Sequence, residues 1–198
     1  IIFGANSIEL NCQGHKINAT GFNFGISATN KQNITVRNCI IQRFHIGIYL
    51  LSSNNSILIN NTATLNSFGG IALQSSNNNT LTSNTAKSNS NTGIYLFFSS
   101  SNILTNNTAN SNSDYGIRLE ISNNNNILTN NNANSNGNYG IHLRSSSNNN
   151  VLTNNTANSN GFIGIVLDSS SNNALTNNTA NSNTNYGIYL PSSSNNAI

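Results

Sequence analysis

A repeat of 23 or 24 residues runs through most of the chain, and it restricts the fold more than any other feature. The dipeptide Gly-Ile recurs at this interval and, from Gly47 onward, its isoleucine is followed two residues later by leucine. The repeat glycines are Gly25, Gly47, Gly70, Gly93, Gly116, Gly140, Gly164 and Gly187. Self-similarity at a fixed period of about 20–50 residues is typical of solenoids and other repeat architectures. At this period the 198 residues make between eight and nine units.

The pattern inside one unit predicts β-strands and turns. Gly-Ile-Tyr-Leu alternates apolar and variable positions, which indicates a strand with one buried face, and the SSSNN and NSN tracts are typical of turns. One unit has only about four reliably apolar positions, too few to fold alone. Stacked coils would solve this problem, because parallel strands about 4.8 Å apart bring equivalent residues into columns. The sequence therefore predicts an all-β parallel solenoid with a narrow Ile, Leu and Ala core.

Every full unit also contains LTNNTA or a variant, from residues 58–63 to residues 175–180. The second asparagine of this motif would stack from coil to coil. The predicted column is Asn61, Asn84, Asn107, Asn131, Asn155 and Asn178. Stacked amides hydrogen-bond along a column, each donating to the next. We interpret this asparagine ladder as structural.

The composition excludes several other classes of protein. Nearly half of the residues are Asn, Ser or Thr, but the net charge is only +3 and there is one Pro, unlike a typical disordered tract. Seven Lys and Arg residues, spread from Lys16 to Arg144, are too few and too scattered for a nucleic-acid surface. No segment approaches the roughly 18 apolar residues of a membrane span. We expect no nucleic-acid partner and no membrane insertion by this segment.

Two early motifs add a family resemblance. SIELNCQGHKI at 7–17 and NITVRNCII at 33–41, followed by the GIYL coils, resemble the NosD-like right-handed parallel β-helix proteins found among archaeal and bacterial surface and secreted proteins. The resemblance implies a right-handed β-helix of about eight coils. We expect a single domain over 1–198, with less regular coils over 1–45 and regular repeats over 46–198. The resemblance leaves function open, because this coil serves copper-site maturation factors, polysaccharide-modifying enzymes, adhesins and surface-layer components.

The acidic residues offer one candidate catalytic pair. Glu120, Arg144 and Asp168 each lie four residues after a repeat glycine, so they should stack on three successive coils. The two acids would lie roughly 9.6 Å apart, at the limit of the roughly 6.5–9.5 Å that an inverting glycosidase needs. The intervening arginine stabilises charged carboxylates, which is the opposite of what a general acid needs. We therefore favour an exposed charge ladder, and Glu120 and Asp168 are catalytic only in the alternative interpretation.

Metal-binding signals are weak. His15, His45 and His142 lie in different columns, the chain has no Met, and nothing has ligand spacing. We predict no metal site and no cofactor, although the family that the chain resembles includes copper-site maturation factors.

Cys12 and Cys39 lie in corresponding motifs, LNC and RNC, one coil apart. They are compatible with a disulfide, which would suit an oxidising extracellular location, and equally with two stacked thiols.

Three outward features suggest surface functions. Threonine rows would form at Thr82, Thr105, Thr129, Thr153 and Thr176 and at Thr62, Thr85, Thr108, Thr156 and Thr179. Such rows resemble ice-binding faces, although threonine is common on any exposed sheet. We interpret one mixed outward column as ordinary surface packing, with sugar stacking as the alternative. Its members are Tyr49, Ala72, Tyr95, Arg118, His142, Val166 and Tyr189. Asn-X-Ser/Thr acceptors for N-glycosylation, which needs secretion and exposure, begin at Asn18, Asn33, Asn54, Asn60, Asn78, Asn106, Asn154 and Asn177.

The ends of the sequence carry apolar residues, Ile1 to Phe3 and Ala197-Ile198, where soluble solenoids have polar caps. We expect no C-terminal cap, and either excision from a longer protein or head-to-tail stacking of copies into a fibre. The expected function is that of a non-enzymatic extracellular or cell-surface repeat protein: a fibre, an adhesin or a surface-layer element. The alternatives are a carbohydrate-active enzyme or glycan-binding β-helix, an ice-binding solenoid, and a NosD-like copper maturation factor.

Overall fold

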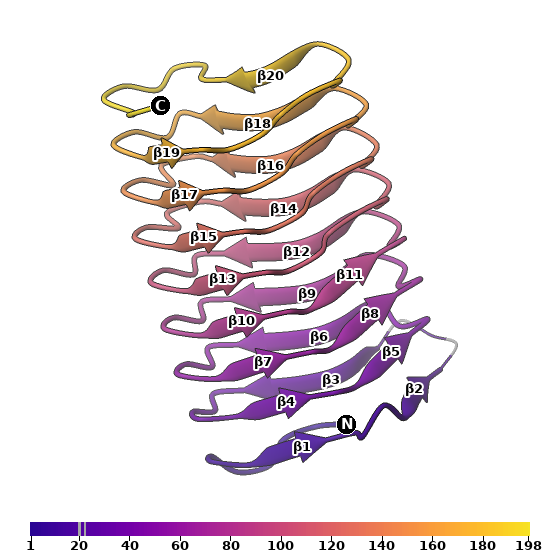
Figure 1. Cartoon of the computed structure of the whole chain (residues 1–198). Coiled ribbons are helices and arrows are strands. Elements are labelled where there is room, and N and C mark those ends of the chain that lie inside the picture. The colour runs from indigo at the N-terminus through magenta and orange to yellow at the C-terminus, as the bar shows by residue number, and fades with distance from the viewer. Residues whose placement is uncertain (20, 22) are drawn as a thin grey trace.

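The computed structural model describes residues 1–19, 21 and 23–198, and those residues form strands and turns without any helix. Consecutive coils stack along one axis as a parallel β-solenoid (Figure 1). Every strand pairing is parallel, and each strand pairs with its equivalents one coil before and one coil after. This confirms the all-β solenoid of about eight coils.

The coils build three sheets, here called A, B and C. Sheet A contains the longer strands: β3 (Phe24–Thr29), β6 (Ile46–Leu51), β9 (Gly69–Gln74), β12 (Thr92–Phe97), β14 (Tyr115–Glu120), β16 (Tyr139–Arg144), β18 (Ile163–Asp168) and β20 (Tyr186–Tyr189). Sheet B contains β1 (Glu9–Asn11), β4 (Thr35–Arg37), β7 (Ile57–Ile59), β10 (Thr80–Thr82), β13 (Ile103–Thr105), β15 (Ile127–Thr129), β17 (Val151–Thr153) and β19 (Ala174–Thr176). Sheet C contains β2 (Lys16–Asn18), β5 (Ile40–Gln42), β8 (Thr62–Thr64) and β11 (Thr85–Lys87).

Sheet C shortens to single bridges after β11. Thr85 pairs with Thr108, and the bridges continue at every coil as far as Thr179. The first coil step is longer than the others, because Glu9 pairs with Thr35 whereas Thr35 pairs with Ile57. Later coils repeat at 23 or 24 residues, in the register that the repeat glycines predict.

The core is a stack of identical layers. Sheet A contributes an isoleucine column from Ile26 to Ile165 and a second column that is leucine from Leu50 to Leu167, sheet B contributes mainly leucines from Leu58 to Leu175, and sheet C contributes alanines from Ala63 to Ala157. Almost all of these side chains are fully buried. Burying one Leu or Ile contributes about 1.5–3 kcal/mol, so one coil gains little alone and the stack gains in proportion to its length.

Every repeat glycine from Gly25 to Gly164 lies where the backbone of the next coil approaches closely. A Cβ on Gly116 would lie 2.6 Å from the carbonyl oxygen of Gly140 and 2.7 Å from Nδ2 of Asn136. No real side chain fits in that space, so the position between sheets C and A accepts only glycine. The Gly-Ile repeat therefore reports a steric requirement of the coil corner.

The other corners use left-handed backbone at Asn and Ser, residues that tolerate it better than most. The residue before each member of the predicted ladder has φ between 53° and 56°: Asn60, Ser83, Asn106, Asn130, Asn154 and Asn177. This recurrent turn explains much of the unusual Asn and Ser content. Leu65, Phe98 and Ile121 also have positive φ, and at these bulky residues the same conformation is strained.

Candidate functional site

The predicted asparagine ladder lies buried in the corner between sheets B and C. Nδ2 of Asn84 donates to Oδ1 of Asn107 at 3.1 Å, and Nδ2 of Asn107 donates to Oδ1 of Asn131 at 3.0 Å. Each Oδ1 also accepts the backbone N–H of the preceding asparagine, and each Nδ2 also donates to a carbonyl such as that of Leu81. The side chains therefore satisfy backbone groups that the turn leaves unpaired, as buried polar groups require.

Three further ladders follow the other corners, and the sequence reasoning did not find them. The corner between sheets C and A contains Asn66, Asn89, Asn112, Asn136, Asn160 and Asn183. The turn between sheets A and B contains two columns. One consists of Ser56, Asn79, Asn102, Asn126, Asn150, Asn173 and Asn196. The other runs in two parts, Ser53, Ser76, Ser99 and Asn123, then Ser147, Ser170 and Ser193. The first of these ladders has a clear signal, because its asparagine always lies four residues before the repeat glycine.

Cys12 and Cys39 form a disulfide in the first coils, with their Cα atoms 4.8 Å apart. The backbone N–H of Cys39 donates to Oδ1 of Asn61 at 3.1 Å. The two cysteines therefore occupy the same corner column as the predicted ladder, one and two coils before its first asparagine.

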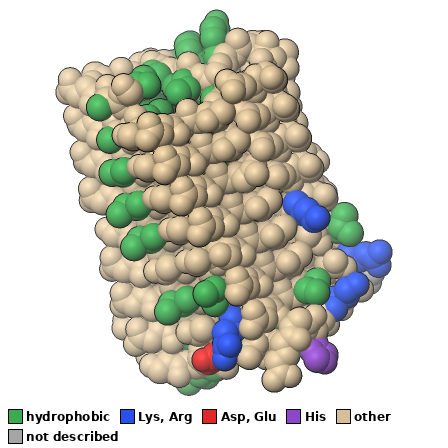
Figure 2. Space-filling view, in the orientation of Figure 1, with side chains coloured by type: hydrophobic (Ala, Val, Ile, Leu, Met, Phe, Trp, Pro, Cys, Tyr) green, Lys and Arg blue, Asp and Glu red, His purple; other side chains and the backbone are tan. Residues whose placement is uncertain are grey.

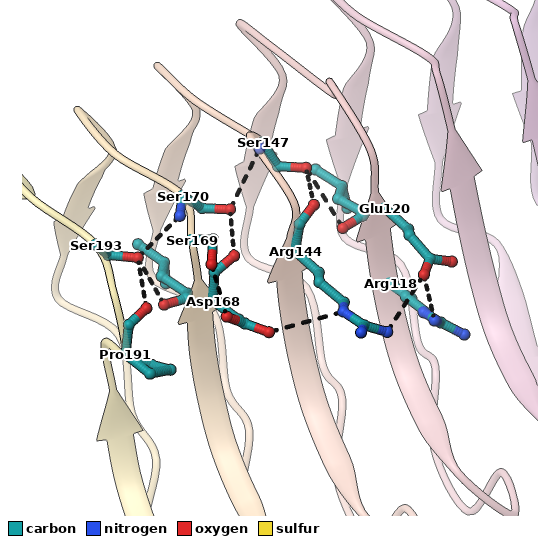
Figure 3. Close-up of polar contacts among 11 residues, drawn as sticks. Arg118, Glu120, Arg144, Ser147, Asp168, Ser169, Ser170, Pro191 and Ser193 are labelled. Carbon is teal, nitrogen blue, oxygen red and sulfur yellow. Dashed lines mark hydrogen bonds and ion pairs between the residues drawn. The ribbon is translucent and has the colours of Figure 1, made fainter.

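Sheet A brings the predicted charged residues together on its outer face. Glu120, Arg144 and Asp168 lie in register on β14, β16 and β18, and Figure 3 shows their side chains meeting in line across these strands. Arg144 lies 3.5 Å from Oε1 of Glu120 and 3.7 Å from Oδ2 of Asp168. Arg118 is an additional partner of Glu120, at 2.7 Å.

The expectation that this ladder is exposed is wrong for Glu120, whose side chain is only 16% exposed. The Tyr95 hydroxyl, from the preceding coil, donates to Oε2 of Glu120 at 2.7 Å. Burial, together with this hydrogen bond to a carboxylate, raises the pKa of Tyr95. Neighbouring aromatic and arginine side chains thus cover the carboxylate, because Arg118 also lies over the Tyr95 and Tyr115 rings.

His142 departs from its interpretation as a surface residue, because it is only 6% exposed. Its ring lies 5.5 Å from that of Tyr115 and 4.9 Å from that of Tyr139, and its Nδ1 is buried without a hydrogen-bond partner among the described residues. Burial, assisted by the nearby Arg118, lowers the pKa of His142 to about 4. The imidazole is therefore neutral at pH 7.

Three of the four side-chain carboxylates are in ion pairs, and the fourth, Asp114, accepts hydrogen bonds from asparagine side chains. Glu9 pairs with Arg37, and Asp114 accepts a hydrogen bond from Nδ2 of Asn138 at 2.8 Å. Glu120 and Asp168 share Arg144. Within the described part of the chain, no three His, Cys, Asp or Glu side chains cluster in a way that could hold a metal ion.

The other outward features are regular. The candidate glycosylation asparagines are exposed except Asn54, which is half-buried and accepts the N–H of Asn77 at 2.6 Å. The first threonine row lies in register on sheet B. Beside it, Ile57, Ile103, Ile127 and Val151 are exposed, and Figure 2 shows hydrophobic side chains repeating from coil to coil along this face. No helix long and apolar enough to cross a bilayer occurs among the described residues.

Several solved structures share this fold at low sequence identity. The periplasmic alginate epimerase AlgG aligns with a TM-score of 0.71 and 20% identity over 86% of this chain and 47% of its own. The Dettilon tailspike protein aligns at 0.73 with 14% identity, over 96% of this chain and 51% of its own. The A-module of the Azotobacter vinelandii mannuronan C-5 epimerase AlgE4 aligns at 0.65 with 15% identity, over 96% and 65%. The chain thus spans about half the length of the first two, and the likeness shows the fold alone.

Two family models match the sequence, whereas no curated protein does. The model described as "Right handed beta helix region" matches residues 118–198, in agreement with the coil described above. The model described as "Periplasmic copper-binding protein (NosD)" matches residues 2–150, well over half of the chain. The chain therefore belongs to the NosD family of right-handed parallel β-helix proteins.

Proposed function

We propose that the chain is a structural repeat scaffold that acts outside the cytoplasm and presents surfaces without catalysing a reaction. The observation that supports this proposal is that the two carboxylates of the candidate catalytic pair, Glu120 and Asp168, are both ion-paired with Arg144. Acid–base catalysis on a sugar needs a group that is free to exchange a proton at the working pH. Glu120 instead lies between two arginines and a tyrosine hydroxyl.

The ladders support the scaffold role. Buried side chains link every regular coil to the next at several corners. Hydrogen bonds therefore hold successive coils together on different sides of the solenoid. The contact between successive coils is heterologous, and a contact of this kind propagates into a fibre when copies repeat it. End-to-end assembly therefore belongs to the proposal.

The location outside the cytoplasm has independent support. The NosD model and AlgG are both described as periplasmic, and the Cys12–Cys39 disulfide suits an oxidising compartment. Glycans on exposed acceptors such as Asn106 would be compatible with such a location.

Copper, which the family description names, does not fit the residues present. Copper sites in proteins use combinations of His, Cys and Met. Here both cysteines are in the disulfide, the chain has no Met, and His142 is buried against the rings of Tyr115 and Tyr139. The described residues contain no cluster that could supply the remaining ligands. We therefore assign no copper chemistry to this chain.

The catalytic alternative is tested with the double variant Glu120→Gln, Asp168→Asn. Purified wild-type protein and variant are incubated with alginate, pectate and neutral polysaccharides, and the products are followed by mass spectrometry and proton NMR. We expect neither protein to cleave or epimerise any polymer. Turnover by the wild type that is lost in the variant would refute the scaffold role and support an enzyme.

Electron microscopy and sedimentation of the wild-type protein test end-to-end assembly. We expect filaments at high concentration, and monodisperse monomers would refute the assembly part of the proposal.

A further inference from the structure

A groove crosses the outer face of sheet A at β9. Ala72 lies in register between Tyr49 on β6 and Tyr95 on β12. Ala72 forms the floor, and larger side chains from its own coil and from the neighbouring coils surround a space of about 180 Å³. This volume is smaller than the roughly 300–1,000 Å³ of pockets for drug-sized ligands, so it suits a single ring.

The walls of the groove are aromatic. On one side, the ring of Phe24 packs on that of Tyr49 with centroids 4.4 Å apart. On the other side, the rings of Phe68 and Phe97 lie 6.2 Å and 5.9 Å from that of Tyr95. The strands that carry Tyr49 and Tyr95 lie two strand spacings apart, about 9.6 Å, and the space of about 180 Å³ lies over the strand between them.

The polar atoms of the groove are few and directed. The Tyr49 hydroxyl donates to Oε1 of Gln74 at 2.6 Å, which fixes the side-chain amide at the groove wall. The Nε2 atom of Gln74 makes no hydrogen bond to any residue that the structure describes, so it can donate to a ligand. The lining includes no Asp, Glu, Lys or Arg.

The charges beyond the groove disfavour an anion. Arg118 is the nearest arginine to the Tyr95 wall, and it is already paired with Glu120 at 2.7 Å. Besides the His45 imidazole, the lining offers no basic group, so a carboxylate entering the groove would lose its hydration without gaining an arginine or lysine partner. A neutral ligand avoids this cost.

We propose that this groove binds one ring of a neutral polysaccharide, with the ring between Tyr49 and Tyr95 and one hydroxyl accepting a hydrogen bond from Gln74. A pyranose presents C–H groups on one face and hydroxyls at its edge, and the electron-rich faces of aromatic rings attract such C–H groups. A polymer fits better than a free sugar because Tyr115 and Tyr139 lie partly exposed further along the same sheet, where a longer chain gains contacts that one ring lacks. The binding is independent of the scaffold role and of any assembly.

Calorimetric titration of the full chain with two neutral hexasaccharides, cellohexaose and laminarihexaose, and with the acidic hexamannuronate tests the proposal. We expect at least one neutral probe to bind and the acidic probe to bind about tenfold more weakly or not at all, a difference of about 1.4 kcal/mol. The proposal is wrong if neither neutral probe binds up to its solubility limit, or if hexamannuronate binds as well as they do.

Variants locate the binding. Ala72→Phe fills the floor and should weaken binding of the neutral probe at least tenfold, whereas the matched change Ala174→Phe on sheet B should leave it unchanged. Tyr95→Phe keeps the ring and should stay within about twofold of wild type. Full affinity in Ala72→Phe would refute the site. If Ala72→Phe fails to fold, as judged by circular dichroism, NMR of the wild type decides instead: the Ala72 methyl and the Gln74 amide must shift on titration, and shifts confined to other faces would also refute it.

Discussion

The first coils and the later coils fill the same corner columns with different chemistry. Between sheets B and C, the column that begins with the Cys12–Cys39 disulfide continues with Asn61 and its ladder. Between sheets C and A, the N–H of Phe44 donates to Asn66 at 3.0 Å, so an aromatic side chain precedes the asparagines there. The N-terminal corners are thus covalent and apolar, whereas the later corners are amide ladders.

The difference shows what a corner position requires. Cys39, Phe44 and Asn61 each donate the backbone N–H to a side-chain oxygen on the next coil, whichever side chain they carry themselves. The N–H of Cys12 donates instead to the carbonyl of Arg37. The disulfide concentrates its stabilisation at one link, about 2–4 kcal/mol in typical proteins. A ladder distributes it, at about 0.5–1.5 kcal/mol for each hydrogen bond, over every coil that it crosses.

The largest effect is expected from breaking a ladder at its centre with Asn107→Ala. The substitution leaves the buried N–H of Asn84 without a partner, at a cost of about 1–3 kcal/mol. It also removes the two hydrogen bonds that Nδ2 of Asn107 donates to the Leu81 carbonyl and to Asn131, each contributing about 0.5–1.5 kcal/mol. Denaturant unfolding should therefore show a loss of about 2–6 kcal/mol. The control is Asn106→Ser, at the exposed neighbouring position where another repeat has Ser83, and it should change stability by less than about 0.5 kcal/mol. Equal effects in both variants would show that the ladder contributes nothing.

The disulfide provides the matching experiment in the first coils. Cys12→Ala, Cys39→Ala should destabilise the chain by about 2–4 kcal/mol, with hydrogen exchange rising first in β1 to β5. Cys12→Ala, Cys39→Asn should recover about 0.5–1.5 kcal/mol of this loss, because the new amide can donate to Asn61 as the later asparagines do. If the asparagine variant is no more stable than the alanine variant, the two kinds of corner are not interchangeable.

Acid should loosen the regular coils before the first ones. The folded pKa of His142, about 4, lies below the ordinary value of 6.5, so the unfolded state binds more protons between these values. Stability is therefore full above about pH 6.5 and decreases as the pH falls toward 4, by up to about 3 kcal/mol. The variant His142→Phe should lack this decrease, whereas His15→Asn, at an exposed position, should retain it. Unfolding free energies measured across this pH range check the prediction; identical slopes in wild type and His142→Phe would contradict it.

The smallest effect on stability is expected at the charge ladder of Glu120, Arg144 and Asp168 on the outer face of sheet A. Arg144 is 46% exposed, and partly exposed ion pairs contribute about 0–1 kcal/mol each. Arg144→Ala should reduce stability by no more than about 1 kcal/mol in low salt and by less in high salt, as measured by thermal unfolding. A loss of stability as large as that of Asn107→Ala would contradict this prediction, because it would mean that the outer ion pairs stabilise the regular coils as much as the asparagine ladder does.

Much of the fold was predictable because a repeat converts sequence spacing into spatial register. The Gly-Ile interval places Glu120, Arg144 and Asp168 in one column without any knowledge of coordinates. The Asn61 ladder followed for the same reason. In each case the contact joins equivalent positions on successive coils.

Contacts between different columns were not predictable in this way. Tyr95 reaches Glu120 across 25 residues, one coil plus two positions, and nothing in the period indicates that diagonal. The burial of His142 depends on Tyr115 and Tyr139 from a neighbouring column. The groove at β9 arises because one coil has Ala72 where the neighbouring coils have Tyr49 and Tyr95. This is a property of a single repeat, which a comparison of the repeats with one another does not reveal.

The asparagine ladders also give the solenoid a net dipole along its axis. In the column from Asn61 to Asn178, every Nδ2 donates to the Oδ1 of the following coil. The amide dipoles therefore add head to tail along the axis, as peptide dipoles do in an α-helix, and the asparagine ladder from Asn66 to Asn183 has the same sense. A rod built in this way is polar along its length, and a negatively charged group placed on its axis is attracted toward the C-terminal coils.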